Sequence, residues 1–249
     1  MARVLVIEHE ANAGIGLVGE RMSSAGIEVD IVGPEVGRAV PSSTEGYDGV
    51  VVLGGTPGPQ DDDTADWLPG VRAVMRASLD REVPLLGICL GAQLLAVVAG
   101  GTVGPVRSAA EVGLCQLRLT DASVGDPLLD GLPSSLEAMQ WHFLEVHELP
   151  EGSVSLCESD RCANQAFRVG RSAWGVQFHL EALASTVADW ALSGSEDLEA
   201  VGLSIDEVVG PMRDREAELR EVWSLVADRW IGIVEHDRVV AEVPSSCGT

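Results

Sequence analysis

Cys89 lies between two glycines, at the point where an apolar strand-like run changes into an apolar helix-like run. Residues 83–88 are β-branched and leucine-rich, and residues 94–99 have the composition of a buried helix. A sharp turn from strand to helix exposes the side chain at its centre, and Gly87 and Gly91 leave room for such a turn. A thiol at a helix N-terminus is favoured as the thiolate, because the unpaired N–H groups there stabilise negative charge. The setting therefore indicates a nucleophile, although a lone cysteine in an apolar run is more often a structural residue.

A candidate base and a group to orient it, His179 and Glu181, follow downstream. The alternation of Val176 and Phe178 predicts a strand that ends at the histidine. Side chains two residues apart in an extended segment point the same way, so we expect the Glu181 carboxylate beside the His179 ring. Taken alone, this pair has two other interpretations: a pair at the surface, or a histidine that is hydrogen-bonded in the core. Together with Cys89 it supplies a nucleophile, a base and an orienting carboxylate.

Two glycines, Gly54 and Gly55, come directly after the buried strand pattern of residues 47–53. Glycines in this place let the backbone approach a ligand and direct N–H groups at it. An ordinary Gly/Pro-rich loop is the alternative interpretation. A phosphate-binding P-loop is excluded, because no Gly-Lys-Ser/Thr sequence follows.

Taken together, these segments resemble those of the class I glutamine amidotransferases, the Cys-His-Glu glutaminases, and most closely their free-standing GMP-synthase-like members. The resemblance covers about residues 1–236, and the cysteine and histidine segments are highly specific in combination. The matching stretches, in chain order, are Leu53-Gly54-Gly55, Trp67-Leu68-Pro69, residues 86–96, Glu111-Val112-Gly113, Gln140-Trp141-His142, Gln165-Ala166-Phe167 and residues 175–181.

The resemblance implies a mechanism for these residues. Cys89 would attack the side-chain amide carbon of L-glutamine and form a γ-glutamyl thioester. His179 would move the protons, and Glu181 would hold its imidazole. Backbone N–H groups of Gly55 and Leu90 would form the oxyanion hole. The residues that the resemblance implies in substrate binding are Gly54, Gln93, Trp141, His142, Phe143 and Leu144.

Some of these positions have a second interpretation or depart from the family pattern. Without the resemblance, Gln93 would be a helix residue hydrogen-bonded to a neighbouring loop, and His142 fits a structural role equally well. Leu180 replaces a proline that is usual in the family, and Leu144 replaces the aspartate of many GMP-synthase-like members. Thr56 also stands where proline is usual. None of these departures removes a member of the triad.

The resemblance implies a glutaminase that releases ammonia for a separate synthetase, because the sequence encodes no ATP-binding or acceptor domain. A stand-alone γ-glutamyl hydrolase or peptidase, acting on γ-glutamyl compounds, is the alternative. A non-catalytic regulatory homologue is disfavoured, because Cys89, His179 and Glu181 are all present. Neither a cofactor nor a metal is expected, since no cluster has metal-ligand spacing. The remaining histidines are predicted to lie in loops or at the surface: His9, His147 and His236.

Strand and helix patterns alternate along residues 3–88, which predicts a parallel sheet with right-handed crossovers. Short strand patterns between residues 114 and 179 predict an antiparallel extension, and helices are predicted over residues 183–192 and 211–231 with a linker at 193–196. The predicted fold is a doubly wound, mostly parallel α/β sheet with flanking helices; the resemblance makes it flavodoxin-like, of the class I amidotransferase type. We expect a single domain over residues 1–236 and a flexible tail over residues 237–249.

The formal net charge is −23, and all 16 Lys and Arg residues are arginine. Such a surface repels nucleic acid and anionic membranes, so neither is an expected partner. The acidic runs at residues 61–63 and 196–221 predict solvated faces or, alternatively, a docking surface for a basic partner.

The cysteines and the N-terminal segment indicate a cytoplasmic protein. Five cysteines, an odd number without CxxC or zinc spacing, together with a nucleophilic thiol are typical of a reducing compartment. No secretory signal is visible, because the apolar opening at residues 4–7 ends at Glu8. Residues 83–106 are apolar enough to suggest a membrane span, but glycines divide them into strand, turn, helix and loop.

Overall fold

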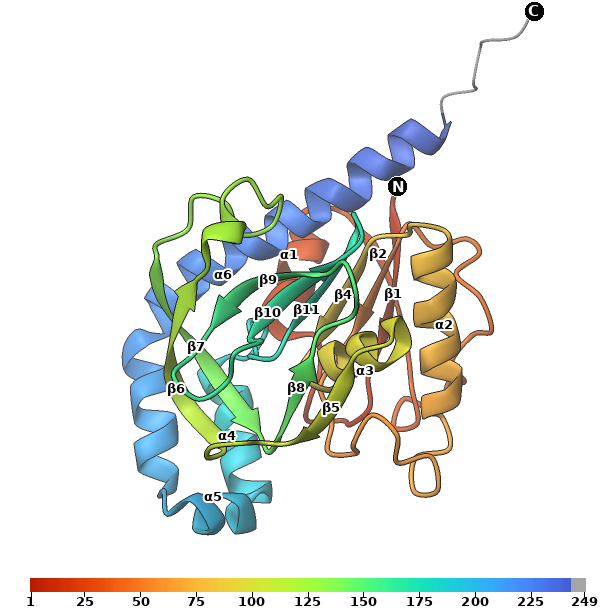
Figure 1. Ribbon diagram of the computed structural model, residues 1–249. Coiled ribbons are helices and arrows are strands. Elements are labelled where there is room, and N and C mark those ends of the chain that lie inside the picture. The colour runs from red at the N-terminus through yellow and green to blue at the C-terminus, as the bar shows by residue number, and fades with distance from the viewer. Residues whose placement is uncertain (243–249) are drawn as a thin grey trace, which may run out of the picture.

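A nine-stranded sheet with apolar residues on both faces forms the centre of the protein, whose computed structural model describes residues 1–242 (Figure 1). The strand order is β2-β1-β3-β4-β11-β10-β9-β6-β7. The first five strands in this order run parallel: β2 (Glu28–Val32), β1 (Arg3–Ile7), β3 (Gly49–Val52), β4 (Leu85–Ile88) and β11 (Ala173–Val176). The predicted α/β fold with a mostly parallel central sheet is confirmed. The strand predicted over residues 173–179 ends earlier, at Val176, and it belongs to the parallel half because it pairs with β4.

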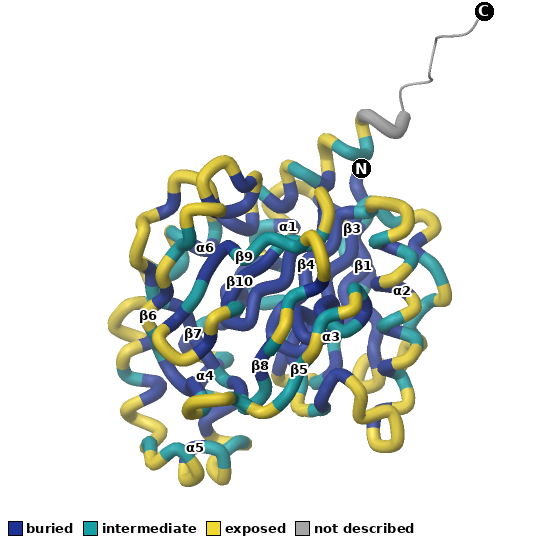
Figure 2. Tube along the Cα trace, in the orientation of Figure 1, coloured by how far each residue is buried: buried dark blue, intermediate teal, exposed yellow. Residues whose placement is uncertain are grey.

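Helices cover both faces of the parallel half because its strands alternate apolar side chains between the two faces. On one face, Val4 and Val6 pack in a core shared with α1 (Gly16–Ser24) and the C-terminal half of α6 (Ile205–Glu242). On the other face, Leu5 and Ile7 pack in a core shared with α2 (Leu68–Asp80) and α3 (Leu90–Ala99). Figure 2 shows the resulting buried centre, with the exposed residues on the surrounding helices and loops.

The sheet continues as the predicted antiparallel extension. Its strands are β10 (Ala166–Val169), β9 (Val154–Glu158), β6 (Glu111–Leu119) and β7 (Ser135–His142), each antiparallel to its neighbour. A short 3₁₀ turn (Asp121–Ser123) follows β6. Two further strands, β5 (Thr102–Pro105) and β8 (Leu144–Glu148), form a separate antiparallel pair. The sequence did not predict this pair; no residue of β5 is buried, so its apolar pattern is weak.

The C-terminal segment differs most from prediction. The linker expected at residues 193–196 is largely helical, because only Gly194 separates α4 (Ala184–Ser193) from α5 (Ser195–Val201). Helix α6 begins at Ile205, before the predicted start at residue 211, and Ser204 and Glu207 cap its start by bonding each other's backbone N–H groups. The flexible tail predicted from residue 237 is wrong for residues 237–242, which continue α6, and its remainder lies outside the described residues.

Helix α6 lies against both halves of the sheet. Its first turns pack with β6, α4 and α5 in a third core that includes Val208, Val209 and Met212. Its C-terminal end projects past the sheet, near the N-terminus of the chain (Figure 1). None of the helices within residues 1–242 is both long and apolar enough to cross a bilayer.

Candidate active site

Cys89 occupies a strained turn between β4 and α3, as its glycine-flanked sequence predicts. Its backbone has φ 51° and ψ −106°, in a region that non-glycine residues rarely adopt, and the residue is the N-cap of α3. A Cβ atom on Gly87 would lie 2.4 Å from the Gly91 carbonyl oxygen, and one on Gly91 would lie 2.0 Å from that of Val52. Glycine is therefore required on both sides of the turn. Cys89 is 6% exposed, so its thiol is reached only through the adjoining cavity.

Backbone hydrogen bonds hold this turn between two neighbouring strands. The Cys89 N–H donates to the Val176 carbonyl at the end of β11, at 2.8 Å. The Gly91 N–H donates to the Leu53 carbonyl just after β3, at 3.2 Å. The carboxyl ends of β3, β4 and β11 thus meet at the cysteine, which is where open α/β sheets place their ligand sites.

His179 and Glu181 lie beside each other, as the spacing predicts. The distance from His179 Nδ1 to Glu181 Oε1 is 2.7 Å, and both side chains are buried. The His179 backbone N–H donates to the Met139 carbonyl of β7 at 2.8 Å, and the Trp190 ring packs edge-on with its centroid 4.7 Å from that of the imidazole. Neighbours from β7 and α4 therefore fix the imidazole, and the continuous strand expected up to His179 is not needed.

The charge on the imidazole depends on its two neighbours. Burial alone lowers the pKa of His179, but the Glu181 carboxylate and the Cys89 thiolate outweigh this effect and raise the pKa to about 10. A hydrogen bond with Cys89 contributes to the same shift. At neutral pH the ring is therefore an imidazolium, held by the Glu181 carboxylate on one side and facing the Cys89 sulfur on the other.

The Gly54–Gly55 loop contacts the catalytic pair closely. A Cβ atom on Gly54 would lie 2.9 Å from His179 Cε1 and 3.5 Å from Cys89 Cβ, so only glycine fits without displacing the ring. The N–H of Leu90, the first residue of α3, cannot be paired within the helix. The next loop residue, Thr56, donates its N–H to Glu10 Oε1 at 2.6 Å. This bond ties the loop to the segment that follows β1.

His9 supports the same loop from behind. It lies in the loop after β1, one of the two settings expected for it, but it is not at the surface: it is 1% exposed, and its Nδ1 accepts a hydrogen bond from Trp67 Nε1 at 3.0 Å. A Cβ atom on Gly55 would lie 2.8 Å from His9 Cβ, so the two backbones are packed tightly. Burial lowers the pKa of His9 to about 4, which keeps it neutral.

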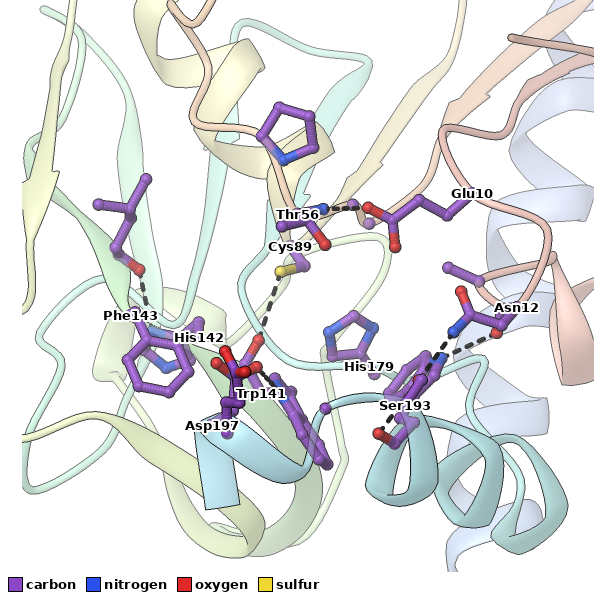
Figure 3. Close-up of a pocket in the computed structure, with 18 of the residues that line it drawn as sticks. Glu10, Asn12, Thr56, Cys89, Trp141, His142, Phe143, His179, Ser193 and Asp197 are labelled. Atoms are coloured by element: carbon purple, nitrogen blue, oxygen red, sulfur yellow. Dashed lines mark hydrogen bonds between the residues drawn. The ribbon is translucent and has the colours of Figure 1, made fainter. Parts of the chain in front are cut away.

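A cavity of about 550 Å³ opens at Cys89 and His179 (Figure 3). It is bounded by the loops after β1 and β3, by the β7–β8 connection, and by the α4–α5 corner at residues 193–197. The residues expected to bind substrate all line it: Gly54, Gln93, Trp141, His142, Phe143 and Leu144. Gly55 also lines it, while Leu90 and Glu181 lie behind the lining residues.

Several lining residues were not identified from the sequence, and three of them are carboxylates. Glu10 comes from the loop after β1, and Glu196 and Asp197 come from the first turn of α5. Asp197 accepts a hydrogen bond from Trp141 Nε1 at 2.9 Å. The position of Glu10 just after the first strand was an available signal, because neighbouring parallel strands end at one edge. The α5 carboxylates belong to the acidic run at residues 196–221, which was interpreted as a solvated face or a docking surface, so their place at the cavity was not predicted.

Buried amides connect the cavity wall to the nucleophile. Gln93 Nε2 donates to the Leu144 carbonyl at 3.3 Å and to Gln177 Oε1 at 3.2 Å. Gln177 Nε2 in turn lies 3.6 Å from Cys89 Sγ. Gln93 thus has the structural role that its sequence position alone suggests, in addition to lining the cavity, and Gln177 was missed.

A second buried group holds the same wall from the antiparallel extension. His142 Nδ1 donates to the Leu144 carbonyl at 3.0 Å, and His142 Nε2 lies 3.2 Å from Glu111 Oε2. Gln165 Nε2 donates to the same carboxylate oxygen at 2.7 Å, and Gln140 donates to Gln165. His142 therefore both lines the cavity and carries a structural hydrogen-bond network. In the described part of the chain, no three His, Cys, Asp or Glu side chains are grouped to hold a metal ion.

Comparison with known proteins places this site in a family. The family model described as "Glutamine amidotransferase class-I" matches residues 16–190. The chain is 39% identical over 104 residues to a glutamine-hydrolyzing GMP synthase subunit of Methanopyrus kandleri, covering 41% of this chain and 54% of that protein. It is 31% identical over 137 residues to gamma-glutamyl peptidase 5 of Arabidopsis thaliana, covering 54% of each. These matches span about half the length of the two relatives.

The fold comparison extends over nearly the whole chain. A crystal structure of a glutamine amidotransferase from Methylobacillus flagellatus has a TM-score of 0.85 and 27% sequence identity, covering 94% of this chain and 95% of that one. The matched residues of the family model include the Cys89 turn and the His179–Glu181 pair. The chain belongs to the class I glutamine amidotransferase family.

Proposed function

We propose that the protein hydrolyses the side-chain amide of L-glutamine through a thioester on Cys89 and releases ammonia for a separate synthetase. The observation that carries this proposal is the cavity in which the Cys89 thiol meets the buried His179–Glu181 pair. Family membership supports the substrate, and the name of the Methanopyrus kandleri relative supports the division of labour between subunits.

In the first half-reaction, the Cys89 thiolate attacks the amide carbon of glutamine, and the carbonyl oxygen becomes an oxyanion. The N–H groups of Gly55 and Leu90 are proposed to bind that oxygen, each contributing about 3 kcal/mol to the transition state. The His179 imidazolium gives its proton to the nitrogen, the C–N bond breaks, and ammonia leaves. The product is a γ-glutamyl thioester with a neutral imidazole beside it.

In the second half-reaction, His179 takes a proton from water, and the resulting hydroxide attacks the thioester carbon. The C–S bond breaks, glutamate is released, and the thiolate–imidazolium pair forms again. Glu181 holds the ring through Nδ1 and stabilises its positive charge in both halves of the cycle. The carboxylates of Glu10, Glu196 and Asp197 lie where they can attract the α-ammonium group of the substrate.

The partner is proposed to present a basic surface. The net charge of −23 and the carboxylates at the cavity mouth favour association with such a surface. We also propose a cytoplasmic setting, because a thiolate nucleophile and the unpaired Cys115, Cys157 and Cys162 require a reducing compartment.

A stand-alone γ-glutamyl hydrolase is the second candidate. The cavity continues from Cys89 to the α4–α5 corner, which supports a leaving group larger than ammonia. The similarity to a gamma-glutamyl peptidase favours the same chemistry.

Glutamate release by the purified chain tests both candidates. Glutamine and γ-glutamyl peptides are compared as substrates, with and without candidate synthetases. A glutaminase rate that rises when a synthetase is added supports the first candidate, and fast partner-free cleavage of peptides supports the second. Cys89→Ala is expected to abolish either activity. If Cys89→Ala leaves the rates unchanged, the proposal is wrong.

A further inference from the structure

The side chain of Gln177 contacts the sulfur of Cys89. Gln177 follows the last residue of β11 and is 1% exposed. Its backbone N–H donates to the Gln165 carbonyl at 2.8 Å, which holds it at the end of the strand. Its Nε2 lies 3.6 Å from Cys89 Sγ, within hydrogen-bonding distance of sulfur.

The direction of the Gln177 amide is set by its other neighbour. A primary amide has two N–H donors on nitrogen and only acceptors on oxygen. Gln93 Nε2 uses one N–H on the Leu144 carbonyl and the other on Gln177 Oε1. If the Gln177 amide were reversed, two NH₂ groups would face each other and a carbonyl oxygen would face the sulfur. The hydrogen bonds therefore permit one orientation, in which Gln177 donates to Cys89.

We propose that Gln177 is a positioning residue that stabilises the Cys89 sulfur as a thiolate, and that Gln93 holds it in the donating orientation. A hydrogen bond to a charged acceptor is about twice as strong as one to a neutral acceptor, so this N–H favours thiolate over thiol and over thioester. In the proposed mechanism the sulfur is a thiolate when it attacks the amide, and it becomes a thiolate again when the thioester is hydrolysed. Gln177 therefore assists formation of the nucleophile and departure of the sulfur.

The expected effect on catalysis rests on the proposed function. The hydrogen bond from Gln177 to Cys89 does not depend on it. Within residues 1–242, the Cys89 sulfur has three polar neighbours: the Trp141 carbonyl oxygen at 3.9 Å, His179 and Gln177. His179 carries the proton that moves during the reaction, whereas Gln177 offers a fixed dipole that exchanges no proton. The two contributions are separable, because a change at Gln177 leaves the His179–Glu181 contact in place.

The test measures alkylation of Cys89 by iodoacetamide as a function of pH in the full chain. The rate is followed by mass spectrometry on the peptide that contains Cys89, because the other cysteines also react. Gln177→Met keeps the length of the side chain and removes the donor. Gln177→Glu keeps the oxygen that accepts from Gln93 and places a carboxylate oxygen at the sulfur.

For Gln177→Met we expect the midpoint of the alkylation profile to move up by about one pH unit, which lowers the thiolate fraction about tenfold at pH values well below both midpoints. Gln177→Glu is expected to move it further, because negative charge then faces the sulfur. Gln93→Met is expected to give a smaller shift, and the double Gln93→Met, Gln177→Met variant no more than Gln177→Met alone. The matched control is Gln140→Met, another fully buried amide, which bonds Gln165 and not Cys89, and its profile should match that of the unmodified chain.

Unchanged midpoints in folded Gln177→Met and Gln177→Glu would overturn the inference. If neither Gln177 variant folds, the Gln93→Met variant alone tests the inference. An unchanged midpoint of its alkylation profile would likewise overturn the inference. The proposed function is tested separately, because alkylation reports on the sulfur without any turnover. It fails if the Cys89→Ala variant is still active. In steady state, the Gln177 variants should lower kcat more than they raise KM, since the lost bond is to the nucleophile and not to the substrate.

Discussion

The imidazole of His142 lies 3.2 Å from the carboxylate of Glu111, with side chains that are only 1% and 3% exposed. Both ring nitrogens of His142 face acceptors, since Nδ1 points to the Leu144 carbonyl. The pair therefore connects the antiparallel extension to the wall of the cavity at the level of the nucleophile.

Replacing Glu111 should weaken that wall. For Glu111→Gln we expect the free energy of unfolding to fall by about 1–3 kcal/mol, because a buried charged acceptor is lost. The KM for glutamine should rise several-fold with a smaller change in kcat, since the wall and not the nucleophile is disturbed. Denaturant unfolding and steady-state kinetics measure the two effects. A double-mutant cycle with His142→Gln should give a coupling above about 0.5 kcal/mol, and strictly additive losses would argue against the pair.

Glu181→Gln should change the pH dependence of the reaction as well as its rate. The raised pKa of His179 means that the imidazolium is present below about pH 10 and is lost as the pH rises through that value. In the proposed mechanism the imidazolium protonates the leaving ammonia, so activity should fall on that alkaline limb. Removing the Glu181 charge leaves burial, which lowers the pKa of His179, opposed only by Cys89, so the limb should move to lower pH, with a loss in kcat on the order of 100-fold. If the alkaline limb of the pH–activity profile lies at the same pH in Glu181→Gln as in the native chain, the proposed role of Glu181 is wrong.

His9 should make the fold sensitive to mild acid. Its pKa is about 4 in the folded chain and about 6.5 when unfolded, so the unfolded state binds a proton first as the pH falls. Stability should therefore be complete above about pH 6.5 and decrease down to about pH 4, by up to about 3 kcal/mol. Denaturant unfolding of the native chain and of His9→Gln across this range measures the effect. The His9→Gln variant should lack this loss of stability between about pH 6.5 and pH 4. If the free energy of unfolding changes with pH in the same way in the two proteins, the prediction is wrong.

Gly54→Ala should damage catalysis more than stability. The added methyl group would lie 2.9 Å from His179 Cε1 and would push the ring away from Cys89. We expect kcat to fall on the order of 100-fold, because small misplacements of reacting groups are costly. Gly232→Ala is the matched control, since a methyl group there meets nothing within 4 Å in helix α6 and should slightly stabilise the helix. Equal activity of the two variants would argue against a close approach at Gly54.

The parts of the site that the sequence could predict are those with local causes. The turn at Cys89 needs glycines two residues away on each side, and the His179–Glu181 contact follows from a spacing of two. Glu196 escaped prediction because its place at the cavity depends on how α4 and α5 pack against the antiparallel extension. The burial of His9 likewise depends on Trp67, which lies far away in the sequence. The fold class follows from alternating patterns. The strands β5 and β8 are short, and they are held by their mutual pairing and by packing of Val103 and Val146 in the core shared with α3, both of which join residues far apart in the sequence.

Helix α6 has a mechanical consequence for the cavity. Its 38 residues, with Pro211 inside the helix, pack against both parts of the sheet, through Val209 near the start and Trp230 in the C-terminal half. The nucleophile comes from the parallel half, while Trp141 and Leu144 come from the other side. A single helix thus packs against the elements that carry both walls of the cavity, so any change in the gap between these walls would have to disturb the packing along that helix.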